Sequence, residues 1–159
     1  VSTCGIEKGI QEFGDSGLAF LAVSLHAPNQ ELREQLMPRA ARWPLDKLLS
    51  ALEQYPLKTR ERITLEYLVI AGVNDQPEHV RQLARICARL KAKLNLIPCN
   101  PTPGSPYEAP TSEELLRFEK ALWAKNITAI GRKSKGQDIE AACGQLRAAH
   151  EAEKRAGQN

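Results

Sequence analysis

Residues Ile63 to Ile70 read ITLEYLVI, a short run rich in isoleucine, leucine and valine. Such a run, closed by turn residues, predicts a β-strand. A strand end is also indicated at Val1-Ser2-Thr3, and similar runs occur at Leu18–Ser24 (LAFLAVS), Lys93–Pro98 (KLNLIP) and Asn126–Gly131 (NITAIG). Short and nearly continuous apolar runs are typical of strands that are buried on both faces of a parallel sheet.

Apolar stripes with a helical period lie between the predicted strands. They consist of Leu45, Leu48, Leu49, Leu52 and Tyr55, of Val80, Leu83, Ala84, Cys87 and Leu90, and of Leu115, Phe118 and Leu122. Residues at these spacings share one face of a helix. Two helix starts are indicated by a capping residue and a carboxylate three positions later, namely Asp75 with Glu78 and Thr111 with Glu114.

Strands that alternate with helices predict right-handed crossovers and a parallel sheet, so the fold class is α/β. A doubly wound sheet usually carries a GxGxxG phosphate loop after its first strand, and the sequence contains none. In a barrel, functional residues follow the carboxyl ends of several strands. Here the residues in such positions are Ser2, Ser24 with His26, Asn100, and Arg132, Lys133 and Lys135. We therefore predict the C-terminal half of a partial TIM-type (β/α) barrel, with these side chains on one rim.

The composition excludes several classes of protein. Of 159 residues, 42% are hydrophobic and 26% are charged, as in an ordinary globular domain, and the net charge of +3 permits an anionic partner without requiring one. The cysteines Cys4, Cys87, Cys99 and Cys143 have no CxxC spacing, so we predict neither a metal site nor a disulfide framework in this chain.

No apolar run is long enough to span a membrane, and we expect a cytoplasmic protein. Because the chain opens on a strand end, we expect it to be part of a longer protein.

Two groups of residues are candidates for chemistry by residue type alone. Ser24-Leu25-His26 offers a hydroxyl and an imidazole to a polar ligand, although a turn with a hydrogen-bonded histidine gives the same pattern. Cys143 is flanked by small residues and follows a cluster of cations, which favour the nucleophilic thiolate. A cysteine packed on an apolar helix face is the alternative for Cys143. Cys87 belongs to an apolar stripe, so we predict a packing role for it.

Four strings of the sequence, taken in order, resemble signatures of one family. They are Val1–Gly5 (VSTCG), Val23–Asn29 (VSLHAPN), Asn95–Pro101 (NLIPCNP) and Asp138–Leu146 (DIEAACGQL), and Gly72–Asp75 (GVND) and Arg132-Lys133 with Gly136 also fit. The family is that of the radical S-adenosylmethionine (SAM) methyltransferases that modify an adenosine of large-subunit ribosomal RNA, in particular the RlmN-like adenine-C2 branch. The resemblance covers residues 1–148, and its most specific element is the string around Cys143.

The resemblance implies a cofactor site and a methyl carrier. Ser2, Ser24, Leu25, His26 and Asn100 match positions that contact SAM in the family, and Cys143 matches a cysteine that carries a methyl group. In the family, one SAM methylates this cysteine, and a second SAM is cleaved at a [4Fe–4S] cluster to a radical that takes hydrogen from the methylcysteine. The resulting carbon radical adds to the adenine ring. Radical chemistry is needed because an aromatic C–H carbon of adenine is a poor nucleophile.

The resemblance also implies partners and a division of the chain. The expected substrate is 23S rRNA, some relatives also act on tRNA, and the family uses an electron donor such as flavodoxin. Arg132, Lys133 and Lys135 are the expected phosphate contacts. Residues 1–136 are expected to form the C-terminal half of the barrel, and residues 137–159 to form a helical segment that carries Cys143.

Parts of the family's machinery have no counterpart in this sequence. The CxxxCxxC cluster motif, the acidic base and a second cysteine all lie upstream of the matched region in the family, so we expect this chain to be inactive on its own. Two other functions stay open at this point. A related branch methylates adenine at C8 and shares the AACGQL string, and a non-catalytic half-barrel that binds nucleotide or RNA fits the same fold.

Overall fold

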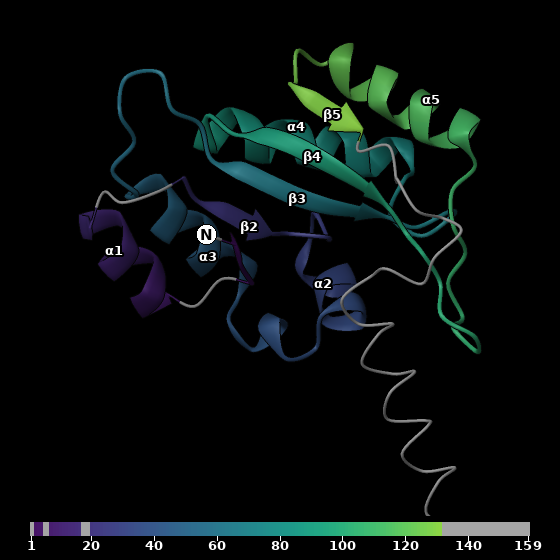
Figure 1. The fold of residues 1–159 in the computed structure, drawn as a ribbon, viewed down its shortest axis with the longest axis horizontal. Coiled ribbons are helices and arrows are strands. Elements are labelled where there is room, and N and C mark those ends of the chain that lie inside the picture. Colours follow the sequence, from purple (N-terminus) through teal and green to yellow (C-terminus); the bar gives the residue numbers. More distant parts are fainter. Residues whose placement is uncertain (1, 5–6, 17–19, 132–159) are drawn as a thin grey trace, which may run out of the picture.

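The computed structural model describes residues 2–4, 7–16 and 20–131, which form a parallel sheet with helices along it (Figure 1). The strands of the described residues are β1 (Ser2–Thr3), β2 (Ala22–Ser24), β3 (Thr64–Val69), β4 (Lys93–Pro98) and β5 (Ala129–Gly131). Their order in the sheet is β1-β2-β3-β4-β5, and each pair of neighbours is parallel. The predicted α/β class with a parallel sheet is confirmed.

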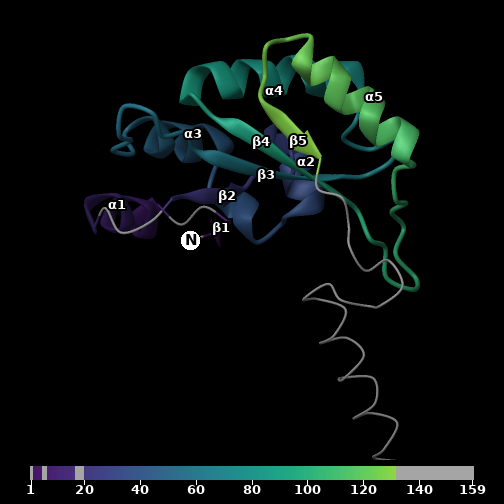
Figure 2. The same cartoon turned by 45° about the horizontal axis from the view of Figure 1, so that its top comes forward.

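Helices connect the strands. They are α1 (Glu7–Ser16), α2 (Gln30–Leu36), the short 3-10 helix η1 (Ala40–Arg42), α3 (Leu45–Glu53), α4 (Pro77–Leu90) and α5 (Ser112–Trp123). The three apolar stripes of the sequence lie on α3, α4 and α5, except that Tyr55 follows the end of α3. Figure 2 shows α4 and α5 beside each other over β4 and β5. Helices α1 and α2 were not predicted. Among the helices of the described residues, none is both long and apolar enough to cross a membrane.

One of the two predicted helix starts is correct. Thr111 caps α5, and the Glu114 carboxylate accepts a hydrogen bond from the Thr111 N–H at 2.8 Å. The prediction for α4 is wrong by one residue, because the cap is Gln76 and not Asp75. The N–H of Gln76 donates a hydrogen bond to Nδ1 of His79 at 3.1 Å. Proline has no N–H to lose at the first helical position, so Pro77 fixes where this helix begins.

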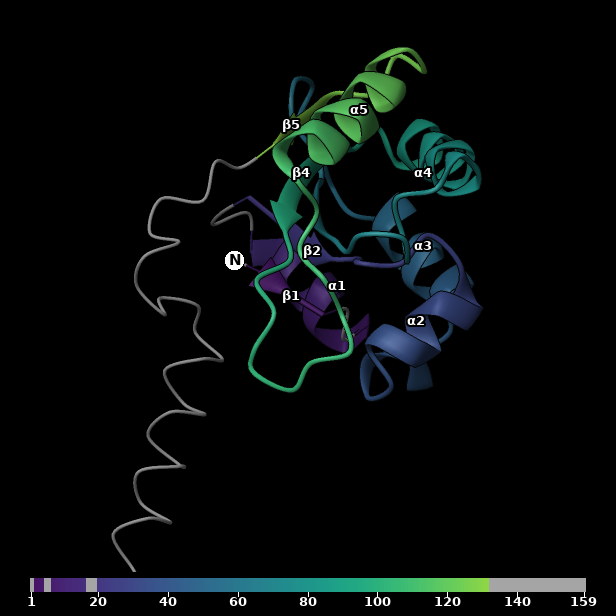
Figure 3. The same cartoon turned by 90° about the vertical axis from the view of Figure 1, so that its right-hand side faces the viewer.

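The two faces of the sheet differ in what covers them. One face packs against the helices, which lie on one side of the sheet in Figure 3. Its buried residues are Val23, Leu65, Tyr67, Val69, Leu94, Leu96 and Ala129. The alternate residues, which are half-buried or exposed, form the other face, named here the open face: Ser2, Ala22, Ser24, Thr64, Glu66, Leu68, Lys93, Asn95, Ile97 and Ile130. Side chains on this face are available to a ligand or to another part of the protein.

A long loop rich in proline follows β4. It runs from Asn100 to Pro110 without helix or strand, and in Figure 1 it extends past the carboxyl ends of the strands. A hydrogen bond from the Ala71 N–H to the Glu108 carbonyl, 3.2 Å long, ties it to the end of β3. The loop therefore stands at the edge of the sheet where ligands of parallel sheets bind.

Candidate functional site

The two predicted serines meet at a carboxylate on the open face. The hydroxyl of Ser2 donates to Oε2 of Glu66 at 2.8 Å, and the hydroxyl of Ser24 donates to the same oxygen at 3.4 Å. Ser24 and Glu66 are register partners in β2 and β3, whereas Ser2 lies beyond β2 on β1. The Glu66 side chain therefore joins three neighbouring strands. Our sequence analysis missed Glu66, and the signal available was a charged residue inside an otherwise apolar strand.

The main chain of Glu66 also holds the turn that follows β2. Its carbonyl accepts hydrogen bonds from the N–H groups of Leu25 at 3.0 Å and of His26 at 3.3 Å. His26 has a φ of 52°, in the left-handed region that residues other than glycine seldom adopt. Leu25 is fully buried in the core, and its carbonyl accepts a hydrogen bond from the Ala27 N–H at 2.7 Å, so this residue holds the turn in place.

The imidazole of His26 is held in one tautomer. The N–H of Leu68 donates to its Nδ1 at 3.0 Å, so the proton of the neutral ring is on Nε2. Burial lowers the pKa of His26 below its usual value, and the nearby Arg33 guanidinium lowers it further, although the Glu66 carboxylate and carbonyl act in the opposite direction. His26 is therefore a neutral ring with one N–H donor, next to the two serines.

A buried asparagine supports this arrangement from behind. Asn74, which belongs to the GVND string, is fully buried, and its Nδ2 donates to the carbonyls of His26 at 3.0 Å and of Leu68 at 2.6 Å. Its Oδ1 accepts from the N–H of Ile70 at 2.8 Å. The Tyr67 hydroxyl donates to the Asn74 carbonyl at 2.7 Å. Asn74 thus fixes both the His26 turn and the end of β3, which gives the GVND string a structural role.

A buried arginine ties the first two strands to α2. The Nη2 atom of Arg33 donates to the Cys4 carbonyl at 3.2 Å, and Nη1 donates to the Leu25 carbonyl at 3.4 Å. The side chain is fully buried, and its Nε atom has no hydrogen-bond partner among the described residues. Burial lowers the pKa of this guanidinium. Arg33 therefore holds together the segments that follow β1 and β2, the strands that carry Ser2 and Ser24.

The remaining predicted residues fall into two groups. Asn100 is exposed in the loop after β4, whereas the turn that contains His26 follows β2, and β3 lies between these two strands. Cys87 is buried as predicted, and burial raises the pKa of its thiol to about 12. Cys143, Arg132, Lys133, Lys135 and the predicted helical segment 137–159 lie outside the described residues.

Comparisons with known proteins agree with this geometry. No family model matches the chain. A dual-specificity RNA methyltransferase RlmN from Nitratidesulfovibrio vulgaris (strain DSM 19637 / Miyazaki F) is 69% identical over 153 residues, covering 96% of this chain and 42% of the relative. The protein of the same name from Lawsonia intracellularis is 60% identical over 147 residues, covering 92% of this chain and 41% of the relative. The chain thus spans less than half the length of these relatives.

Solved structures give the same result for the fold. The crystal structure of a radical SAM methyltransferase from Sphaerobacter thermophilus matches 91% of this chain and 43% of that protein, with a TM-score of 0.83 and 44% identity. A domain of the pyruvate-formate lyase-activating enzyme from Bacteroides vulgatus shares the fold at a TM-score of 0.62, with 15% identity. These likenesses are consistent with a partial (β/α) barrel. Over nearly its whole length, the chain is similar to the C-terminal part of proteins named RlmN dual-specificity RNA methyltransferase.

Proposed function

We propose that the protein containing this chain is a radical SAM methyltransferase that methylates C2 of an adenosine in 23S rRNA and also acts on tRNA. The observation that carries the proposal is the convergence of Ser2 and Ser24 on Glu66, next to the neutral ring of His26. These polar groups occupy the open face of a parallel sheet, near its carboxyl edge, where such sheets bind ligands. The names of the relatives supply the reaction class.

The residues of the open face fit the chemistry of SAM. Because Ser2 and Ser24 give their hydroxyl hydrogens to Glu66, their oxygens are acceptors for the ribose hydroxyls of a cofactor. The Nε2–H of His26 is a donor for an acceptor atom of the same molecule. In this proposal Asn100 contacts the cofactor from the loop after β4, and the buried Leu25 supports the site by fixing the turn that carries His26.

SAM on this face would supply the methyl group and, with a [4Fe–4S] cluster and an electron donor such as flavodoxin, the radical chemistry that an aromatic carbon requires. In this proposal the sulfur of Cys143 would lose its proton and accept the methyl group as the S–CH3 bond of SAM breaks and S-adenosylhomocysteine leaves, while Arg132, Lys133 and Lys135 would contact RNA phosphates. The described residues contain no group of three or more His, Cys, Asp or Glu side chains suited to a metal ion. Because the sequence has no CxxxCxxC motif, the proposal assigns the cluster ligands to another part of the protein.

The test uses the intact protein loaded with its cluster, together with SAM, a reductant and an RNA fragment. Nucleosides from the digested RNA are separated and identified by mass spectrometry against 2-methyladenosine and 8-methyladenosine standards. We expect 2-methyladenosine from the wild type and none from Cys143→Ala. Ser24→Ala should raise the KM for SAM, whereas Ser50→Ala on α3, away from the open face, should not.

Two results would contradict the proposal. Formation of 8-methyladenosine alone would assign the protein to the C8 branch. A complete lack of methylated RNA, from protein shown to hold its cluster, would leave a binding module in place of an enzyme.

A further inference from the structure

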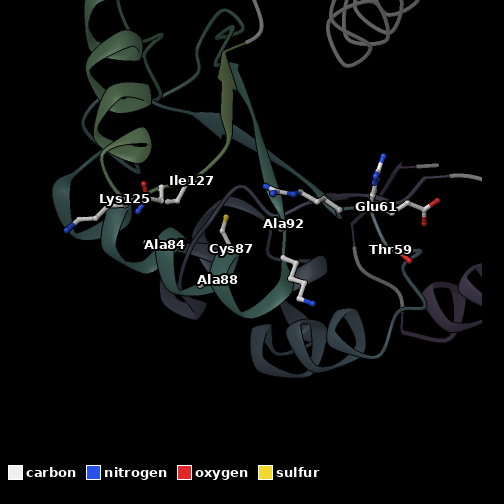
Figure 4. Close-up of a pocket in the computed structure, with 12 residues that line it drawn as sticks. Thr59, Glu61, Ala84, Cys87, Ala88, Ala92, Lys125 and Ile127 are labelled. Carbon is white, nitrogen blue, oxygen red and sulfur yellow. The ribbon is translucent and has the colours of Figure 1, made fainter.

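A polar cavity lies at the amino ends of the strands, apart from the open-face serines. It has a volume of about 650 Å³, and its lining comes from the segments just before β3, β4 and β5, together with one side of α4. In Figure 4, Cys87 lies between Lys125 at one end of the cavity and Thr59 with Glu61 at the other. The amino ends of three strands therefore meet around one hollow.

The lining of this cavity is strongly basic. It contains four cations, Arg60, Arg62, Lys91 and Lys125, and one carboxylate, Glu61. The Glu61 carboxylate accepts a hydrogen bond from the Lys58 N–H at 3.0 Å, and in Figure 4 it points away from Cys87. The ion pairs found among the described residues are Arg89 with Glu53 and the contact of His79 with Glu78, so none of the four cations is paired there.

Helix ends explain only part of this charge. Lys91 caps the end of α4 and Lys125 follows α5, and cations at helix C-termini interact favourably with the helix dipole. Arg60 and Arg62 lie outside any helix. The Nη1 atom of Arg62 donates to the neutral hydroxyl of Thr128 at 3.1 Å, which leaves its charge uncompensated. Like charges gathered around one cavity repel each other, and an anion placed among them would relieve the repulsion.

The cavity is suited to binding and offers no nucleophile. Its cysteine, Cys87, is buried, and burial raises the pKa of the thiol to about 12, so the thiolate is absent near neutral pH. The other lining side chains are cationic, apolar or neutral polar groups apart from Glu61. An anion held here would therefore be bound without being changed.

We propose that this basic cavity binds phosphates of the RNA substrate at a distance from the modified adenosine. The inference rests on the proposed function, because RNA is the anion that such an enzyme must hold. The cavity lies beyond the amino end of β3 and is lined in part by α4 on the helix-covered side of the sheet, whereas Glu66 belongs to the open face, at the third position of β3. A folded RNA is large enough to reach both sites, whereas a mononucleotide is not. Contacts of this kind add affinity and salt dependence and carry no sequence preference.

The experiment compares two triple variants of the intact, cluster-loaded protein that lose the same charge. The cavity variant is Arg60→Gln, Lys91→Gln and Lys125→Gln. The control variant is Arg39→Gln, Lys47→Gln and Lys120→Gln, all exposed positions outside the cavity. RNA affinity is measured over a range of salt concentrations, alongside SAM affinity and methylation at saturating RNA. A third arm adds inorganic phosphate at constant ionic strength.

We expect the cavity variant to bind RNA roughly tenfold more weakly and to show a shallower salt slope, by about one for each phosphate that the variant no longer neutralises. SAM affinity and methylation at saturating RNA should be unchanged. Equal behaviour of the two triple variants, with an active wild type, would overturn this inference alone. Binding of inorganic phosphate to the wild type but not to the cavity variant, with equal RNA affinity of the two proteins, would assign the cavity to a free anion and overturn the inference. A wild type that methylates no RNA would overturn the proposed function as well.

Discussion

The hydroxyl of Ser2 donates a hydrogen bond to Oε2 of Glu66 over 2.8 Å, although β2 lies between their strands and 64 positions separate them in sequence. The same carboxylate oxygen accepts from Ser24 in the intervening strand. Hydrogen bonds to a charged acceptor are stronger than those between neutral groups. Glu66 therefore orients two hydroxyls together, and it is the residue that makes the open face a single site.

The first prediction concerns this carboxylate. Replacing Glu66 with Gln keeps one acceptor oxygen but removes the charge, so the serine hydroxyls lose their fixed direction. We expect the affinity of the intact protein for SAM to fall by about 1 kcal/mol, or roughly fivefold, as measured by calorimetry. Glu66→Asp shortens the side chain but keeps the charged acceptor for Ser24. Its affinity for SAM should therefore fall less than that of Glu66→Gln.

A mutant cycle separates positioning from direct contact. If Glu66 acts through the serines, Glu66→Gln should add little to the loss already caused by replacing Ser2 and Ser24 with Ala together. Fully additive losses would mean that Glu66 contributes independently of the two serines, and the positioning role would be wrong.

The second prediction concerns the protonation of His26. Its pKa is lowered in the folded protein by burial, whereas in the unfolded chain it titrates near its usual value of 6.5. The unfolded state therefore takes up a proton first as the pH falls, so stability is greatest above 6.5 and declines as the pH drops toward the lowered pKa. We expect the Tm of the intact protein to fall between pH ~7.5 and ~5.5, and the fall to be smaller in His26→Asn, since Asn tolerates the left-handed backbone.

His79 provides the control for this measurement. Burial lowers its pKa as well, against the opposing effects of Glu78 and Asp75, so it contributes to the same decline. NMR titration of labelled histidine rings, assigned with the His26→Asn and His79→Gln variants, separates the two. A His26 ring that carries its neutral-form proton on Nδ1 would contradict the assigned tautomer, and a ring that titrates above 6.5 would contradict the lowered pKa.

The third prediction concerns Asn74. Replacing it with Ala leaves the Ile70 N–H and the carbonyls of His26 and Leu68 without their partners inside the protein. Buried groups left unpaired cost about 1 to 3 kcal/mol each before relaxation, so we expect a loss of about 3 kcal/mol in unfolding free energy. Because the His26 turn loosens, SAM affinity should fall too. Asn74→Asp keeps the acceptor for the Ile70 N–H but removes the donor to the two carbonyls, so its unfolding free energy should be no higher than that of Asn74→Ala. Recovery of stability in Asn74→Asp would contradict this role of the Asn74 amide.

The fourth prediction concerns the start of α5. Thr111→Ala removes the hydroxyl that accepts from the Glu114 N–H at 3.2 Å and should destabilise the protein by about 1 kcal/mol. The Glu114 carboxylate, whose pKa is lowered mainly by the hydrogen bond from the Thr111 N–H, is the other half of this cap. Thermal unfolding of Thr111→Ser, which keeps the hydroxyl, gives the matched control. A Ser variant as weak as the Ala variant would rule out the cap as the cause.

Most of the fold could be predicted from the sequence because each buried strand carries a continuous apolar run. Strand ends were less well predicted, since Asn126 to Thr128 continue the run but form the turn before β5. Helix α2 was missed because it is short and begins at a polar cap, Asn29, whose side chain accepts from the Leu32 N–H. The cap of α4 was misplaced because Asp75 and Glu78 have the right spacing one residue too early.

The site was predictable at its strand ends and not within its strands. Ser2, Ser24 and His26 follow or close apolar runs, so topology alone brings them to one edge. Glu66 lies inside β3, and only the register of β3 against β2 shows that it faces Ser24. Asn74 and Arg33 were missed because their roles depend on main-chain carbonyls of other segments, which no sequence spacing reveals.

The central claim is that Cys143 carries the methyl group, and mass spectrometry of the tryptic peptide from Gly136 to Arg147 tests it most directly. The peptide should come from the intact protein, purified from its own cells with its cluster in place. The account predicts one added methyl group on the sulfur of Cys143. An unmodified cysteine in protein that nevertheless methylates RNA would contradict it.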